Sequence, residues 1–132
     1  MTRIINSELG TSPFQRLFHS ERILQKWSDL SKCVSADGKL SKELKENVRR
    51  VLAFGNGCSY CQAKGTPLKP NEVKESHALG FAEVFLTQRE KTEDEFFQVL
   101  KEALTDEEIS ELLAFICFTT AQQYFGALME IK

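Results

Sequence analysis

Apolar residues recur every three or four positions along most of this chain, which is the spacing of one face of an α-helix. The two clearest stripes are Ile23, Leu24, Trp27 and Leu30, and then Leu44, Val48, Val51 and Leu52. Ser20 and Ser41 stand just before these stripes, where a serine can cap a helix. No segment alternates apolar and polar residues as a half-buried strand does. The pattern therefore predicts an all-α fold.

Further helices are expected in the second half. Asn71 can cap a helix whose apolar stripe would be Val73, His77, Phe81, Val84 and Phe85. The pairs Thr92 with Glu95 and Thr105 with Glu108 fit the capping box that opens a helix. With a short helix from Cys58 to Lys64 and a last one from about Asp106 nearly to the C-terminus, the chain makes about six helices. We expect one compact domain spanning residues 1–132.

The last helix carries more apolar surface than its neighbours. From Ile109 to Phe118 it is apolar almost all round, which is typical of a helix buried in a core or at a subunit interface. In a chain of 132 residues, one subunit could cover only part of that surface. The pattern therefore predicts a homo-oligomer.

Composition narrows the classes of function. The formal net charge is −2, and no basic run is interleaved with aromatic residues, so a nucleic-acid partner is not expected. The N-terminus holds no apolar stretch of signal-peptide length, and the most apolar segment, Leu112 to Phe118, is too short to cross a bilayer. We therefore expect a cytoplasmic protein with no membrane partner.

The candidate chemistry lies in Gly57-Cys58-Ser59-Tyr60-Cys61-Gln62. Two cysteines at positions i and i+3 share one face of a helix and are close enough to form a disulfide. A helix that begins here would also direct free N–H groups at the sulfurs, which favours the reactive thiolate. Structural zinc is a weaker interpretation, because such sites usually need a second ligand pair, and the chain offers none. Cys33 and Cys117 have apolar neighbours and are interpreted as buried packing residues.

The stretch from Leu40-Ser41-Lys42-Glu43-Leu44-Lys45-Glu46 through Gly57-Cys58-Ser59-Tyr60-Cys61 resembles the alkylhydroperoxidase D-like, carboxymuconolactone decarboxylase superfamily. Redox members of that family have a helical Glu, eleven intervening residues, a C-x-x-C pair, and a His four positions after the second Cys. Here Glu46 precedes Cys58 by 58 − 46 = 12 positions, which fits. Gly80-Phe81-Ala82-Glu83 and the segment Leu104 to Leu113 are also similar to the family. The resemblance covers roughly Phe18 to Met129.

The resemblance implies a cysteine-based peroxidase or thiol–disulfide oxidoreductase that uses no metal and no organic cofactor. It assigns Cys61 as the attacking thiolate, Cys58 as the resolving cysteine and Glu46 as a proton-transfer group. The substrates would be a hydroperoxide or a partner disulfide, with a dithiol as the reductant. One position departs from the family, because Gly65 stands where the relay His is expected.

Two alternatives stay open. By pattern alone, Glu46 could pair with Arg49 or Arg50 on a solvated helix face. The whole chain could instead be a helical oligomer that binds a ligand or partner, with the cysteines as a redox sensor or a vestige. Lactone decarboxylation, the chemistry of the family's namesake, is a weaker reading, because it does not call for a cysteine pair.

Overall fold

The computed structural model describes residues 2–132, and every regular element in that range is helical. The elements are η1 (Gln15–Leu17), α1 (Glu21–Ser35), α2 (Lys42–Gly55), α3 (Ser59–Gln62), α4 (Val73–Gln88), η2 (Arg89–Lys91), α5 (Asp94–Lys101) and α6 (Asp106–Leu128). The predicted all-α class and the six α-helices are confirmed for the described part of the chain. None of these helices is long and apolar enough to cross a membrane.

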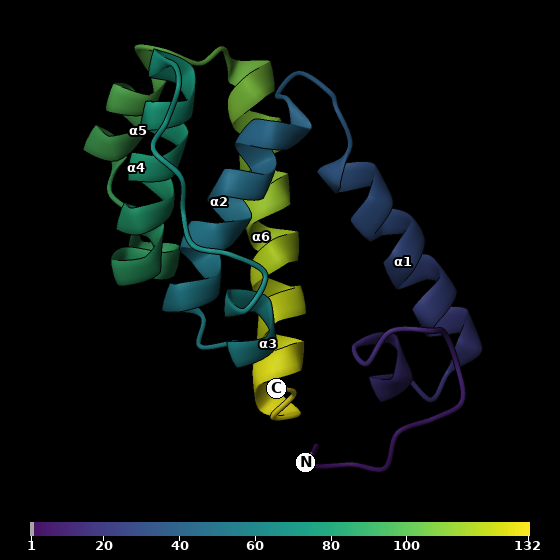
Figure 1. Ribbon diagram of the computed structural model, residues 1–132. Helices are drawn as coiled ribbons and strands as arrows, with labels where there is room; N and C mark the ends of the chain where they lie inside the picture. The colour runs from purple at the N-terminus through teal and green to yellow at the C-terminus, as the bar shows by residue number, and fades with distance from the viewer. Residues whose placement is uncertain (1) are drawn as a thin grey trace.

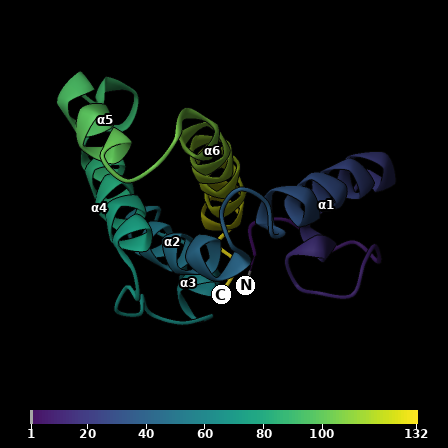
Figure 2. The ribbon, with the colours of Figure 1, turned by 90° about the horizontal axis from the view of Figure 1, so that it is seen from above.

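The centre of the molecule is the pair α2 and α6, which run side by side (Figure 1). Ser41 caps α2 through its hydroxyl, as predicted, and the stripe Leu44, Val48, Val51 and Leu52 is buried. Thr105 and Glu108 form the predicted capping box at the start of α6. Helices α4 and α5 cover one side of this pair, while α1 lies on the opposite side (Figure 2).

Helix α4 corrects two of the predictions. It begins at Val73 with Glu72 as its N-cap, and Asn71 makes no cap. Its buried residues are Glu75, Ala78, Leu79, Phe81 and Ala82, whereas Val73 is exposed and His77 is only partly covered. The predicted stripe was right at Phe81 and Phe85, which pack in the core, but it missed Ala78, Leu79 and Ala82. Helix α4 contacts both α2 and α5, so apolar residues occur on more than one face. The predicted Thr92–Glu95 capping box is also absent, since α5 follows Glu93 without a side-chain cap.

Helix α1 is attached more loosely than the others. Ser20 caps it as predicted, but none of its residues is fully buried. Ile23 and Leu30, expected on its covered stripe, are 54% and 48% exposed. Trp27 is its main anchor: its ring packs against Phe18 and Phe125, and its Nε1–H donates to Gln122 Oε1 at 2.9 Å. Figure 1 shows α1 inclined to the central pair, and the half-exposed Ile23 and Leu30 border an apolar groove between α1 and α6.

Candidate redox site

The cysteine pair lies where the chain turns out of α2. Helix α2 ends at Gly55, and Gly57 has φ = 70°, a left-handed conformation that glycine adopts without strain. Cys58 follows as the N-cap of the one-turn helix α3, and its Sγ accepts a hydrogen bond from the Cys61 N–H at 3.2 Å. The two residues form a disulfide, with Cα atoms 5.2 Å apart. The structure thus brings Cys58 and Cys61 together as their spacing predicted.

The two sulfurs differ in their surroundings. Cys58 is fully buried, whereas Cys61 keeps 8% of its surface exposed. Both belong to a small apolar cluster with Leu17, Ala53 and Ile131 at the lower end of the molecule. On the α6 side the backbone comes so close at Gly126 that a β-carbon there would lie 3.1 Å from Cys58 Sγ. Any reagent that reaches the pair must therefore meet Cys61 first.

A cavity of about 250 Å³ leads to Cys61, and we call it the aromatic cavity. It lies between the N-terminal segment with α1 on one side and α3 on the other. Its lining residues are Ser12, Phe14, Gln15, Phe18, Leu24, Trp27, Ser28, Ser31, Lys32, Tyr60, Cys61, Lys64 and Gln122. Cys58 is not among them, so the cavity serves one sulfur of the pair.

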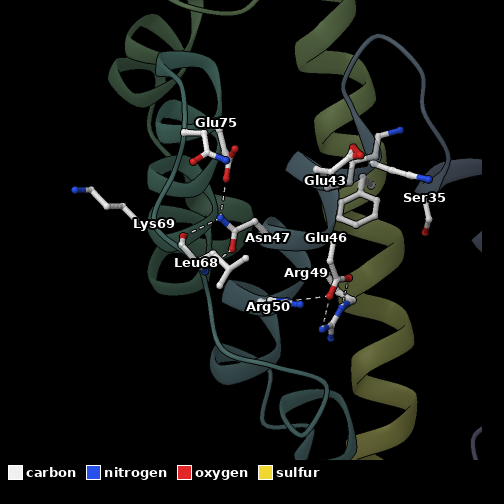
Figure 3. A pocket seen from close by; sticks show the side chains of 13 residues that line it. Ser35, Glu43, Glu46, Asn47, Arg49, Arg50, Leu68, Lys69 and Glu75 are labelled. Carbon is white, nitrogen blue, oxygen red and sulfur yellow. Dashed lines mark hydrogen bonds and ion pairs between the residues drawn. The ribbon is translucent and has the colours of Figure 1, made fainter.

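Glu46 projects from the middle of α2 and is held by two arginines. Its carboxylate accepts from Arg49 Nε at 2.7 Å and from Arg50 Nε at 3.0 Å (Figure 3). Burial alone would raise the pKa of Glu46, but these hydrogen bonds and charges outweigh it and hold the pKa below its usual range. The predicted ion pairs of Glu46 with Arg49 and Arg50 are therefore confirmed, while its role in proton transfer stays a prediction.

Arg49 also contacts α3, because its guanidinium donates to the Cys61 carbonyl at 3.0 Å. Glu46, Arg49 and Cys61 thus form one chain of contacts from α2 to α3. Glu46 also borders a separate cleft of about 710 Å³ over α2, whose charged wall is shown in Figure 3. Arg49 was named in the sequence only as a possible ion-pair partner. Its hydrogen bond to α3 depends on how two helices pack, which no spacing rule reports.

Gly65 has a conformation that explains why no histidine stands there. Its φ is 133°, in the region that L side chains rarely adopt, and a β-carbon would lie 3.0 Å from Arg50 Cζ. Neither His19 nor His77 lines the cavity in front of Cys61, where a relay histidine would be needed. His77 Nδ1 lies 2.9 Å from the Val73 carbonyl oxygen on α4, and His19 Nε2 lies 2.7 Å from the Ile5 carbonyl oxygen.

Lys64, next to Gly65, lines the aromatic cavity and lies over the Tyr60 ring, with its Nζ 4.8 Å from the ring centroid. Burial lowers the pKa of Lys64, and the charge of Arg49 lowers it further, which outweighs the opposite effect of Glu46. Positive charge therefore predominates around Lys64. Lys64 and Cys61 are three residues apart in the chain and line the same cavity.

Cys33 and Cys117 correct another prediction. Both are free thiols, and both are exposed rather than buried. Cys33 faces outward because α1 buries no side chain completely, and Cys117 lies on the side of α6 that its neighbours leave open. Apolar neighbours in the sequence indicated burial. Those neighbours lie on the same helix, however, and no second helix in the described part of the chain packs over Cys33 or Cys117 to cover it.

Within residues 2–132, no group of three or more His, Cys, Asp or Glu side chains is arranged to hold a metal ion. The chemical groups that the site offers are thus a disulfide pair, a carboxylate clamped by arginines, and a lysine at the cavity. Comparison with known proteins adds no assignment: no protein-family model matches the chain, and no curated protein or solved structure is significantly similar to it.

Proposed function

We propose that this protein is a thiol–disulfide oxidoreductase of the peroxidase type, working with Cys61 and Cys58 and related to the alkylhydroperoxidase D-like superfamily. The observation that carries the proposal is the asymmetry of the pair. Cys61 borders a cavity, while Cys58 forms the disulfide with Cys61 and is fully buried. An attacking cysteine needs access to substrate, and a resolving cysteine needs only the neighbouring sulfur.

The proposed cycle has three balanced steps. The Cys61 thiolate attacks a peroxide oxygen, so that an S–O bond forms as the O–O bond breaks, and the alkoxide leaves as an alcohol after taking one proton. Cys58 then attacks the sulfenic acid sulfur; the disulfide forms and water leaves with the Cys58 proton. A dithiol partner reopens the disulfide by exchange and becomes a disulfide itself. A reducing compartment such as the cytoplasm would supply that dithiol.

Proton transfer in this cycle would run between Glu46 and the cysteines through water, because Gly65 supplies no side chain and an arginine guanidinium does not release its proton. With a lowered pKa, Glu46 is a weak base near neutral pH. Arg49 acts as a positioning residue, since it holds the Cys61 carbonyl and the Glu46 carboxylate at once. We therefore expect modest turnover compared with an enzyme that has a relay histidine, since general acid–base help is worth about 10²–10⁴-fold.

The test is peroxide consumption with dithiothreitol as the donor. The parent should turn over, Cys61→Ser should abolish consumption, and Cys58→Ser should give one turnover with a sulfenic acid that dimedone traps. A double variant, Cys33→Ser with Cys117→Ser, is the matched control and should keep the activity. Loss of activity in that control, or full activity in Cys61→Ser, would contradict the assignment.

A second candidate, a homo-oligomeric binding protein with sensor cysteines, is favoured by one observation. Between α1 and α6 lies an apolar groove of about 630 Å³, lined by Ile23, Trp27, Leu30, Phe118 and Ala121 with two basic residues. A second subunit could cover this groove. The mass in solution at micromolar concentration tests assembly, and Leu30→Glu should lower that mass. Unreactive thiols together with a stable oligomer would favour this candidate over the enzyme.

A further inference from the structure

The aromatic cavity in front of Cys61 carries charge of one sign. Lys32, in the last turn of α1, and Lys64, just after α3, both line it. Among the described residues that line the cavity, none is an Asp or a Glu. The nearest acid in the electrostatic surroundings of Lys64 is Glu46, which is already engaged by Arg49 and Arg50. The cavity is therefore suited to a ligand that brings its own negative charge.

Aromatic side chains also line the cavity. The Phe18 ring lies 5.4 Å from the Trp27 ring and 5.9 Å from the Phe14 ring, both in edge-to-face contact. Rings that are fixed against one another form a rigid apolar surface on which a flat or branched hydrocarbon group can pack. The volume, about 250 Å³, is slightly below the usual range for drug-sized ligands, so it suits one substituted ring rather than a peptide.

The charged and aromatic residues that line the cavity with Cys61 come from different elements of the fold. Tyr60 and Cys61 lie on α3, and Lys64, three residues after Cys61, lines the same cavity with its ammonium group over the Tyr60 ring. Phe18 and Trp27 approach from the N-terminal segment and α1. A ligand that reaches Cys61 thus meets a cationic rim and an aromatic wall together.

We propose that this cavity binds small aromatic carboxylates, and that the preferred substrate of Cys61 is an aryl-alkyl hydroperoxide that carries a carboxylate. The reactive part rests on the function proposed above, whereas anion binding rests on the cavity alone. The steps are those of the proposed cycle: the hydroperoxide gives the corresponding alcohol, and a dithiol supplies the two electrons.

Binding is measured without any turnover. Trp27 is the single tryptophan of the chain and lines the cavity, so its fluorescence reports occupancy. Titration with 4-isopropylbenzoate should give a saturable change that weakens with added salt, and the neutral methyl ester should bind more weakly. Lys64→Glu and Lys32→Glu should each weaken binding by about three- to tenfold, because attraction is replaced by repulsion.

Lys26→Glu is the matched control. Lys26 also lies on α1 beside Trp27, but it borders the groove between α1 and α6 instead of the aromatic cavity. This variant should bind 4-isopropylbenzoate as the parent does. If Lys26→Glu weakens binding while Lys64→Glu does not, the ligand occupies the other groove and the proposal is overturned.

Turnover is then compared between two hydroperoxides. One is 4-isopropylbenzoic acid with the hydroperoxide on its isopropyl group, and the other is the methyl ester of that hydroperoxide. The acid should be consumed with the higher kcat/KM, and Lys64→Glu should remove that preference. Equal consumption of acid and ester by the parent, with equal binding of the two unreactive analogues, would overturn the inference and leave the peroxidase function intact. Selective binding of the carboxylate without consumption of any hydroperoxide would overturn the peroxidase function and leave the anion site.

Discussion

At Gly126, α6 lies against Cys58, so adding one methyl group there tests how tightly the site is packed. A β-carbon would lie 3.1 Å from Cys58 Sγ and 3.1 Å from Ile131 Cγ2. Forcing an extra carbon into a packed core costs about 1–3 kcal/mol. Alanine gains about 1 kcal/mol over glycine inside a helix. Gly126→Ala should therefore lower the free energy of unfolding by about 0–2 kcal/mol.

Gly80 supplies the matched control for this change. It lies inside α4, and a β-carbon there would meet no atom within 4 Å. Gly80→Ala should therefore show only the gain in helix propensity, about 0.5–1 kcal/mol. The two variants should differ by about 1–3 kcal/mol in denaturant unfolding at equal m-value.

The comparison is repeated on reduced protein. Without the bond to Cys61, the Cys58 side chain can rotate away from α6, so the difference between the two variants should shrink. If both alanines stabilise the oxidised protein equally, then α6 does not press on Cys58, and the sealed position of that sulfur has been misjudged.

Three other predictions concern the remaining site residues. Because its pKa is lowered in the folded chain, Glu46 contributes stability that is present above its unfolded pKa and is lost as the pH falls below about 4.5. Glu46→Gln should therefore reduce the fall in melting temperature at low pH, and an unchanged fall would show that the arginine contacts are not formed. Gly65→His should lower the melting temperature by the equivalent of about 1 kcal/mol or more, without a gain in turnover, because a side chain at φ = 133° is strained; a stable and faster variant would refute this. In reduced native protein, iodoacetamide should modify Cys33 and Cys117 first and Cys58 last, as mass mapping over time would reveal, and early labelling of Cys58 would contradict its burial.

The sequence predicted the parts of the fold that depend on local chemistry. Ser41 and Thr105 are caps because their hydroxyls accept hydrogen bonds from N–H groups three residues further along the chain. The same spacing at Thr92 and Glu95 makes no cap, because α5 begins one residue later, after Glu93. The buried face of α4 could not be predicted in the same way. A helix in contact with two neighbours has apolar residues on several faces, so periodicity alone does not select Ala78 and Ala82 over Val73 and Val84.

In the candidate site, too, local spacing predicted one feature and packing determined another. The pairing of Cys58 with Cys61 follows from a three-residue separation on one turn of helix, which the sequence displays directly. The cavity in front of Cys61 joins Phe18 and Trp27 to Lys64, residues that are separated by dozens of positions and are brought together only by packing. Periodicity indicated burial of Trp27 but could not show that it lines the same cavity as Cys61.

Helix α1 forms one wall of that cavity and yet has no fully buried residue, so it is the part of the molecule that detaches most easily. Local opening has a lower free energy where little apolar surface is covered. Amide hydrogens of α1 should therefore exchange faster than those of α2, whose stripe is at the centre of the core. In the proposed cycle, a bulky dithiol partner would reach the disulfide more readily when α1 opens, while the α2–α6 pair stays folded.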